Sequence, residues 1–532
     1  MVLVVFVIAL TLRVTGDHLV PPFDDLYHLK RIANFPHALI FDADRGERGA
    51  FCPWPPLYDT AAAGVMRMFG GVSWMPPLFF ALFAAAVTAF MCGADTPVCA
   101  CTDKSVYATH KSVSVTRLAA MTAGLTLALS PYLIDVSSAG HIDHHYVEPL
   151  LLLLILGATI RRNGIALGMA MAMALFVQTA LIVAAGLAFI ALFFFEDDSA
   201  EGLKAFSIAA AVVTAYRLAM PPGYPQSAWF LGYPHAALLA GAAIACALRE
   251  RASRLTALAG GVAVALAFPA TATAFFSGLR FFKGDPWLKS IVEFQPMLRN
   301  TALIGTDIAN LTGGAVLALL LWRKQRTLAL FAAAYLLLAL SSRRFLVPAI
   351  ALFAIGGAFA AVYSRRRSLA WVAALATILP PLVYDVYTAR VPEPSNNEYR
   401  IIGERMRPLP RGRVLGPWSF GHAIDVIGQK PVIIDNFGSM PDERVFRNAI
   451  EAMLMRRESD LLHYCHARSV RYLVLPHPAY IPATAATIGL DPALYSSTGL
   501  ARQTVWSRLH GGEKIGGFTL VSGGAISIWR IE

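Results

Sequence analysis

Long apolar segments, separated by short polar stretches, make up most of the chain. Beyond a first run at the N-terminus, we predict apolar segments at about 74–92, 116–136, 146–160, 163–176, 177–195, 203–221, 229–247, 254–276, 301–322, 327–341, 344–363 and 368–388. Most of them approach the roughly 20 apolar residues that a helix needs to cross a bilayer. The pattern therefore predicts a polytopic α-helical membrane protein with about 13 spans.

Lys and Arg gather in alternate connections between these segments. If the N-terminus is cytoplasmic, six connections fall on the cytoplasmic side, and all of them but "EDDSAEGLK" are basic: "CTDKSVYATHKSVSVTR", "RRNG", "LRERASR", "RKQR" and "SRRRS". This matches the excess of basic residues that cytoplasmic loops carry. An odd number of spans then predicts a multi-pass protein of the inner (plasma) membrane whose C-terminal part is periplasmic or extracellular.

The pattern changes after the last apolar segment. Residues 1–390 form the predicted membrane domain, with longer external loops at 17–73 and 277–300. In residues 396–532, β-branched runs such as "PVIIDNF", "RYLVLPH" and "FTLVSGGAISIWRIE" alternate with the helical stretch "DERVFRNAIEAMLMRRESDLLHYC". This part is predicted to be a soluble mixed α/β domain. The first run, "MVLVVFVIALTLRVTG", lacks a basic n-region and a small-residue cleavage site, which predicts a retained span.

Composition agrees with a membrane protein. Of the 532 residues, 56% are hydrophobic and only 15% are charged, against about 25% charged in soluble proteins, and the mean hydropathy is +0.55. The net charge of +11 does not indicate nucleic acid, because the basic residues lie between apolar segments rather than along one soluble face. The "CAC" at 99–101 could bind a metal with His110, but no second Cys pair follows at a zinc-like distance.

Charged and imidazole side chains gather on the predicted outer side. They are Asp24, Asp25, His28, His141, Asp143, His144, His145, Glu148, Asp285, Glu293, Arg343 and Arg344. Carboxylate-rich sites suit Mg²⁺ or Mn²⁺, and an imidazole favours Mn²⁺. Arg binds phosphate oxygens through two parallel hydrogen bonds. A divalent metal beside a guanidinium, at the boundary of water and lipid, suits the activation of a lipid-linked phosphate as a leaving group.

Each of these residues also has a purely structural interpretation. The stretch "SSAGHIDHHYVEP" fits a polar hairpin at a membrane surface. Asp24 fits a helix cap, and Glu293 fits the cap of an interfacial helix. Arg344 also fits the anchor of a helix end, with a side chain that extends to the lipid headgroups. Independent loops, however, place all these groups on the same side.

Four short motifs follow one another on that side: "DDLYH", "GHIDHH", "SIVE" and, at the end of a late span, "RF". In this order and spacing they resemble the motifs of the catalytic subunit of oligosaccharyltransferase, in its bacterial and archaeal single-subunit form. That family consists of GT-C membrane glycosyltransferases, which move an oligosaccharide from a polyprenyl carrier to asparagine in N-x-Ser/Thr. The resemblance covers essentially the whole chain.

The resemblance implies an inverting transfer to an acceptor protein or peptide, with Mn²⁺ or Mg²⁺ as cofactor. The implied metal ligands are Asp24, Asp143, His145 and Glu293. Asp24 and Glu293 are also expected to bind the acceptor amide, and Arg344 to bind the (di)phosphate of the polyprenyl-linked oligosaccharide. His144 is expected to point away from the metal or to support a ligand.

One motif departs from the family pattern. Where the family has W-W-D-Y-G, which binds the acceptor hydroxyl, this chain has "PWSFGH", so that Trp418 and Gly421 persist and Ser419 replaces the Asp. A neutral hydroxyl forms a weaker hydrogen bond than a carboxylate. A GT-C enzyme that acts on a hydroxyl or lipid acceptor therefore stays an alternative. A membrane transporter is a more remote one, because the polar groups lie at loop ends rather than within spans.

Overall fold

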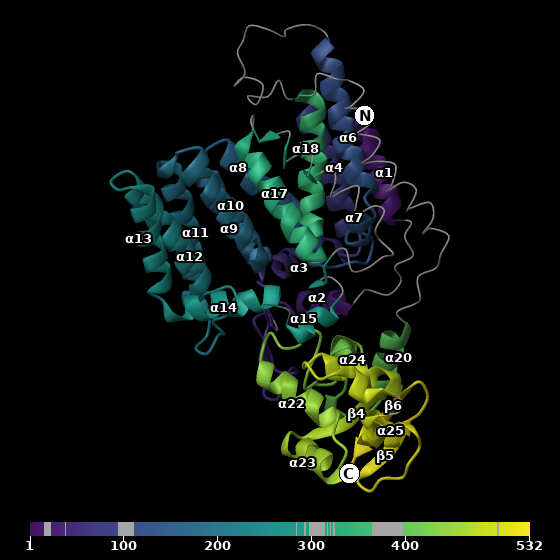
Figure 1. Ribbon diagram of the computed structural model, residues 1–532. Coiled ribbons are helices and arrows are strands. Elements are labelled where there is room, and N and C mark those ends of the chain that lie inside the picture. Colours follow the sequence, from purple (N-terminus) through teal and green to yellow (C-terminus); the bar gives the residue numbers. More distant parts are fainter. Residues whose placement is uncertain are drawn as a thin grey trace.

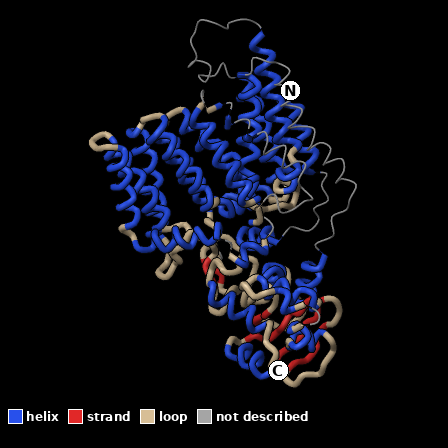
Figure 2. Tube along the Cα trace, viewed as in Figure 1, coloured by secondary structure: helices blue, strands red, loops and turns tan. Residues whose placement is uncertain are grey.

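The computed structural model describes residues 1–14, 23–37, 39–93, 111–283, 285–291, 294–296, 314–315, 318–319, 321–322, 325–363, 397–496 and 499–532. A helical bundle holds the first part of the chain, and a smaller globular domain lies against one end of it (Figure 1). Among the described residues, the strands lie in the smaller domain and in one short hairpin next to it (Figure 2).

The bundle consists of apolar helices packed side by side. They are α1 (Val2–Val14), α4 (Met75–Gly93), α6 (Lys111–Leu129), α7 (Pro131–Asp135), α8 (Glu148–Ile160), α9 (Gly164–Val177), α10 (Ile182–Ile190), α11 (Ser199–Ala219), α12 (Tyr233–Arg249), α13 (Arg254–Leu266), α14 (Pro269–Lys283), α17 (Arg326–Ser341) and α18 (Leu346–Tyr363). Small residues allow the closest approaches. A Cβ on Gly241 of α12 would lie 2.5 Å from the carbonyl oxygen of Gly261 in α13, which is how helices in membranes commonly pack.

Helix length alone does not settle the number of spans. Within the described residues, α11 is the one helix that is long and apolar enough to cross a membrane, and eight shorter apolar helices of 10–17 residues accompany it. The count of about 13 spans therefore stays a prediction.

Proline breaks two of the predicted apolar segments. The segment 254–276 is two helices, α13 and α14, because Pro269 has no N–H with which to continue the first one. The segment 116–136 breaks in the same way at Pro131, between α6 and α7. Figure 1 shows α14 running across the ends of α11 and α12 rather than alongside them. The predicted segments that lie wholly or largely outside the described residues are 301–322 and 368–388.

The predicted external loops contain ordered elements that lie between the bundle and the smaller domain (Figure 1). These elements are α2 (Phe23–Ala33), the hairpin of β1 (Phe41–Asp42) and β2 (Ala50–Phe51), α3 (Leu57–Phe69) and α15 (Pro286–Ser290). Leu26 of α2 and Trp287 of α15 are buried in two apolar clusters of the smaller domain. The external loops thus form the contact between the two parts of the chain.

The smaller domain is mixed α/β, as predicted. Its sheet has the order β3-β4-β6-β5, in which β3 runs parallel to β4 and the other neighbours are antiparallel. The strands are β3 (Arg413–Leu415), β4 (Val470–Pro476), β5 (Phe518–Ser522) and β6 (Ile526–Ile531), and the helices are α20 (Asn397–Met406), α21 (Gly421–Val426), α22 (Glu443–Met453), α23 (Glu458–Ala467), α24 (Ile481–Ala486) and α25 (Val505–His510). The expectation of a strand in "PVIIDNF" is wrong. Val432 makes only isolated parallel bridges, to Arg45 of the first loop and to Val414.

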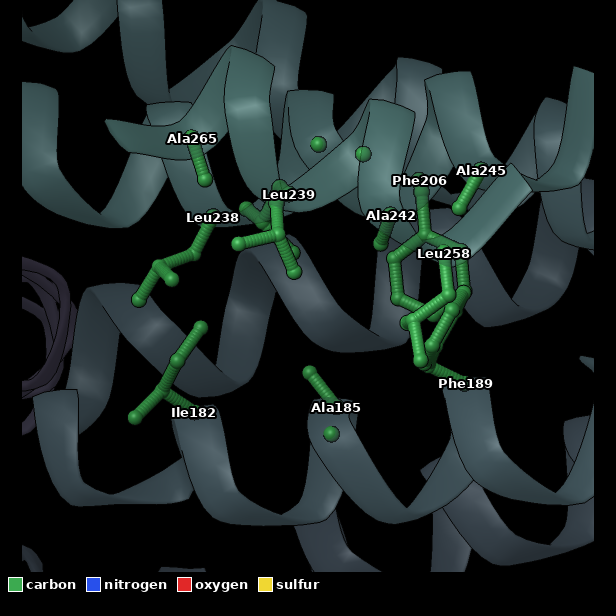
Figure 3. A pocket seen from close by; sticks show the side chains of 14 residues that line it. Ile182, Ala185, Phe189, Phe206, Leu238, Leu239, Ala242, Ala245, Leu258 and Ala265 are labelled. Carbon is green, nitrogen blue, oxygen red and sulfur yellow. The ribbon is translucent and has the colours of Figure 1, made fainter. Parts of the chain in front are cut away.

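A cavity of about 250 Å³ lies between α10, α11, α12 and α13 (Figure 3). Phe189, Phe206, Leu238 and Leu258 are among its lining residues, and no polar side chain is among the described residues that line it. The cavity therefore offers apolar surface but no acid, base or charge. The chemistry of the chain has to lie elsewhere.

Candidate active site

The polar residues that the sequence singles out meet where the bundle contacts the smaller domain. The connection from α7 to α8 is fixed by two backbone hydrogen bonds: Ala139 N–H donates to the Arg13 carbonyl (2.9 Å), and Gly140 N–H donates to the Ser73 carbonyl (3.1 Å). Gly140 has a φ of +87°, which a residue with a Cβ rarely adopts. The short 3₁₀ helix η1 (His144–Val147) follows and leads into α8. This path of the chain places Asp143, His144 and His145 beside α2.

Asp143 is the centre of the cluster and is only 4% exposed. Its Oδ1 lies 2.7 Å from His144 Nδ1 and 3.4 Å from His28 Nε2, and its Oδ2 lies 3.1 Å from His145 Nε2. The side-chain amide of Gln178 lies 2.8 Å from His144 Nε2 and fixes that ring. Three groups of possible metal ligands result: His28, Asp143 and His144; His144, His145 and Glu148; and Asp25, His141 and Asp143. Carboxylate oxygen with imidazole nitrogen is a donor set that suits a divalent transition metal.

A chain of buried partners holds His28 in place. Its Nδ1 lies 2.6 Å from Asp59 Oδ1, and Asp59 Oδ2 lies 2.5 Å from Arg31 Nη1. The imidazole also stacks on the Trp54 ring, with 4.1 Å between centroids and 5° between planes. The Asp59 contact thus fixes the rotation of the His28 ring, and the Trp54 stack fixes its plane.

Arg344 brings a guanidinium to the same place. It lies in the 3₁₀ helix η7 (Arg343–Phe345). Ser342 Oγ caps this helix by accepting a hydrogen bond from the Arg344 N–H (3.3 Å). Arg344 Nη2 is 2.8 Å from Glu148 Oε1, and Nη1 is 2.5 Å from His145 Nδ1. A buried guanidinium next to the cluster of possible metal ligands suits the binding of phosphate oxygens.

The two neighbouring aspartates of α2 have different environments. Asp25 is fully buried, 3.2 Å from His141 Nδ1, and belongs to one of the ligand groups. The Asp24 side chain is 43% exposed and lies 3.7 Å from His422 Nδ1 of the smaller domain. The structure therefore brings Asp25 to Asp143, while Asp24 faces the domain boundary.

The electrostatics reflect a concentration of buried carboxylates. Burial alone would lower the pKa of His28, but Asp59 and Asp143 raise it to about 9. In the same way, Asp25 outweighs burial and raises the pKa of His141 to about 9. Burial opposes the ionisation of Asp143, yet His145 and His144 hold its pKa well below the ordinary range. A divalent cation that binds these groups would displace protons from the imidazoles.

Several predicted site residues do come together. Asp143, His145 and Arg344 share one cluster. Glu293 lies outside the described residues. Of the two expectations for His144, the contact of its Nδ1 with Asp143 Oδ1 at 2.7 Å fits the support of a ligand rather than a ring that points away.

The sequence reasoning missed Asp59, Gln178 and Arg31. Each lies far along the chain from the residue it contacts or in an otherwise ordinary helix. Glu148, by contrast, could be recognised from the sequence as a neighbour of His144 and His145, because it follows them by one helical turn.

The motif at 418–421 lies at the start of α21 in the smaller domain. The Trp418 ring packs against Trp287 of α15, with 6.0 Å between centroids. Ser419 is within hydrogen-bonding reach of Tyr399. Gly421 has no room for a side chain, because a Cβ there would lie 2.3 Å from the Asp435 Cα. The residue after the motif, His422, stacks on Tyr27 of α2 at 4.9 Å.

No protein-family model and no curated protein matches the sequence. Solved structures of an oligosaccharyltransferase from Archaeoglobus fulgidus do match the fold. The archaeal oligosaccharyltransferase AglB in complex with an inhibitory peptide and a dolichol-phosphate has a TM-score of 0.76 at 16% identity, over 98% of this chain and 78% of that chain. The enzyme tethered to an acceptor peptide with the NVT sequon has a TM-score of 0.70 at 16% identity, and its complex with zinc and sulfate has 0.67 at 18%, both over 98% of this chain and 78% of the other.

This chain has the fold of the archaeal oligosaccharyltransferases. The oligosaccharyltransferase fold agrees with the predicted architecture of a helical membrane domain followed by a C-terminal globular domain. The likeness extends over nearly all of the chain at low sequence identity, so that it concerns the backbone and not the identity of single residues.

Proposed function

We propose that this protein transfers an oligosaccharide from a polyprenyl (di)phosphate carrier to the asparagine of N-x-Ser/Thr in acceptor proteins, with inversion at the anomeric carbon. One observation carries the proposal: Arg344 lies against His145, which itself contacts Asp143, in a chain with the oligosaccharyltransferase fold. The structural neighbours were solved with a dolichol-phosphate and with an NVT peptide. These are the two kinds of substrate that the proposed reaction joins.

The residues have distinct roles in this reaction. Asp143 and His145 would hold a divalent cation, Mn²⁺ or Mg²⁺, and the family resemblance implies Asp24 and Glu293 as its further ligands. When bound, such a cation would supply positive charge beside the departing carrier phosphate. Arg344 binds the same phosphate oxygens and is oriented by Glu148, 2.8 Å away.

The acceptor asparagine binds at the boundary of the two parts. Asp24 and Glu293 accept hydrogen bonds from its side-chain NH₂, which frees the nitrogen to attack the anomeric carbon. The bond from that carbon to the carrier phosphate breaks, and one amide proton passes to a carboxylate. Trp418, Ser419 and Gly421 form the pocket for the residue two positions after the asparagine.

The proposed setting follows from the predicted topology. The protein acts as a single subunit in the inner (plasma) membrane, in contact with membrane lipid, and its smaller domain lies on the periplasmic or extracellular face. Nucleic acid plays no part. An enzyme of the same fold with a hydroxyl or lipid acceptor is the alternative, supported by Ser419 in place of an acid.

A transfer assay tests the proposal. The purified full-length protein is incubated with lipid-linked oligosaccharide extracted from membranes and a fluorescent Asn-x-Thr peptide, with Mn²⁺, with Mg²⁺ or with chelator. We expect transfer to asparagine that chelator abolishes and that Mn²⁺ restores better than Mg²⁺. Asp143→Asn and Arg344→Gln should each lower the rate about 100-fold or more, whereas Asp460→Asn, an exposed site on α23, should leave it unchanged.

Comparison of Asp24→Asn with Asp25→Asn assigns the ligand of the first loop. Loss of metal-dependent transfer in Asp24→Asn alone supports the assignment that the family resemblance implies. Glycan found on a Ser or Thr hydroxyl, with none on asparagine, would replace the proposal by the hydroxyl-acceptor alternative.

A further inference from the structure

The polar cluster contains a histidine, the last residue of the motif "DDLYH", to which neither the resemblance nor the proposed mechanism gives a role. His28 comes from α2, on the opposite side of Asp143 from His145. It is 1% exposed and sits among charged groups rather than in an apolar core. Besides packing on Trp54, it contacts two carboxylates and a second imidazole.

The first contact fixes the proton of the ring. Asp59 is paired with Arg31 at 2.5 Å, and it faces His28 Nδ1 at 2.6 Å with its other oxygen. An ionised carboxylate only accepts, so Nδ1 donates and a neutral His28 presents the lone pair of Nε2. A carboxylate behind an imidazole is the usual support of a histidine that binds a metal.

The second contact gives that lone pair a direction. His28 Nε2 lies 3.4 Å from Asp143 Oδ1 and 3.3 Å from His144 Nδ1, and these two atoms are 2.7 Å apart. Two ligand atoms about 2.1 Å from one ion are about 3.0 Å apart at a right angle and about 3.4 Å apart at the tetrahedral angle. His28 Nε2 and Asp143 Oδ1 are therefore spaced as two ligands of one cation are.

A third observation, the buried carboxylate oxygens, agrees with a cation there. Among the described residues, no donor reaches Asp143 Oδ1 or either oxygen of Asp25 with hydrogen-bond geometry, although all three are buried. The buried carboxylates of the cluster are Asp25, Asp59, Asp143 and Glu148, and its buried guanidiniums are those of Arg31 and Arg344. Once a cation has displaced the protons of the imidazoles, the cluster has two more negative than positive charges, which is the charge that one divalent cation balances.

We infer that His28 Nε2 is a ligand of the divalent cation held at Asp143, and that Asp59, fixed by Arg31, orients it. The inference deepens the proposed function, on which it rests only for the presence of a divalent cation. It adds the first external loop to the metal site through an imidazole as well as through a carboxylate. Trp54, stacked on the ring, keeps His28 in the orientation that binds.

Binding of Mn²⁺ tests this without any transfer reaction. The free Mn²⁺ signal in electron paramagnetic resonance gives the Kd of the full-length protein in detergent. We expect His28→Gln to raise the Kd at least 10-fold and Asp59→Asn to raise it about 10- to 100-fold. His463→Gln, at an exposed position on α23, is the matched control and should keep the parent Kd.

Pulsed measurements on the parent protein need no variant and cover the case in which a variant fails to fold. With ¹⁵N-labelled histidine, we expect couplings from at least two imidazole nitrogens on bound Mn²⁺. Coupling from a single imidazole, an unchanged Kd in folded His28→Gln, or no binding of Mn²⁺ by the parent would each overturn the inference. Binding with two imidazoles, together with no transfer to any peptide, would instead keep the ligand assignment and remove the proposed function.

Discussion

A buried ion pair lies at the contact between the two parts of the chain. Arg45 of the first loop is 1% exposed, and its guanidinium pairs with Asp435 of the smaller domain through Nε and, at 3.2 Å, through Nη2. The same guanidinium lies 4.8 Å from the Tyr27 ring centroid and 4.3 Å from that of Phe437. We predict that Arg45→Met, which keeps most of the volume, removes the charge that Asp435 requires.

The expected cost is large because the partner stays buried. Breaking one side of a buried pair typically costs about 3–5 kcal/mol, whereas replacing both sides with apolar groups is often neutral. Arg45→Met should therefore destabilise the docked smaller domain by about that amount, and Arg45→Met with Asp435→Leu should recover most of it. Arg508→Met, which breaks a half-exposed pair with Glu513, is the control and should change little.

The pH dependence gives an independent check. Burial raises the pKa of Asp435, but the charge of Arg45 outweighs it, so that the pKa is lowered in the parent. The parent thus gains stability from the pair above the unfolded pKa of about 4 and loses it as the pH falls through the lowered folded pKa. In Arg45→Met the burial remains without the charge, so the pKa of Asp435 should be raised. The deficit should then be largest at pH 8 and should shrink as the pH falls towards 5, where the neutral acid is tolerated.

Pulse proteolysis across a denaturant series measures the release of the smaller domain, since a protein of several parts need not unfold in one step. An Arg45→Met midpoint equal to that of the parent at pH 8 would refute the reasoning. So would a deficit that grows towards pH 5, because it would show that the carboxylate is not the group left unpaired.

Three further predictions concern the motif and the topology. Ser419→Ala should weaken binding of Asn-x-Thr peptides by about 0.5–1.5 kcal/mol and leave Asn-x-Ala peptides unaffected; an equal rise in KM for both would show that Ser419 only supports Tyr399. Gly421→Ala should lower the thermal stability of the smaller domain, because the new Cβ would lie 2.3 Å from backbone; an unchanged melting temperature in detergent would contradict this. A cysteine introduced at Asp460 should react with an impermeant thiol reagent from outside the cell, and one at Arg251 only after permeabilisation; the reverse would overturn the predicted orientation.

The sequence predicted the parts of the site that are local. Asp143 and His145 lie in one short stretch, and Arg344 lies at a helix end, so each could be found without knowledge of distant contacts. The choice between Asp24 and Asp25 could not be made in this way. Successive residues of a helix point about 100° apart, and the rotation of α2 is set by its packing against the smaller domain through Leu26.

Other features of the fold were hidden for the same reason. The run at 431–437 has the composition of a strand, but Val432 makes only isolated bridges, one of them to residue 45 of the first loop, which no local pattern reveals. The break at Pro269 was visible as a proline, yet apolar residues continue on both sides of it and favoured one long segment. Apolar periodicity locates helices well, but it does not show which loops become part of another domain.

Helix α2 connects the two tasks of the proposed enzyme. On one side, Asp25 and His28 face the cluster around Asp143, where a leaving phosphate would be stabilised. On the other side, Tyr27 stacks on His422, directly after the motif expected to bind the acceptor, and Lys30 is 2.8 Å from Asp425 in the same helix as that motif's glycine. An 11-residue helix with both sets of contacts cannot shift towards one site without moving at the other. A peptide that repositions the smaller domain would therefore also displace the His28 ligand, so that acceptor binding and metal binding should affect each other's affinity by the same factor.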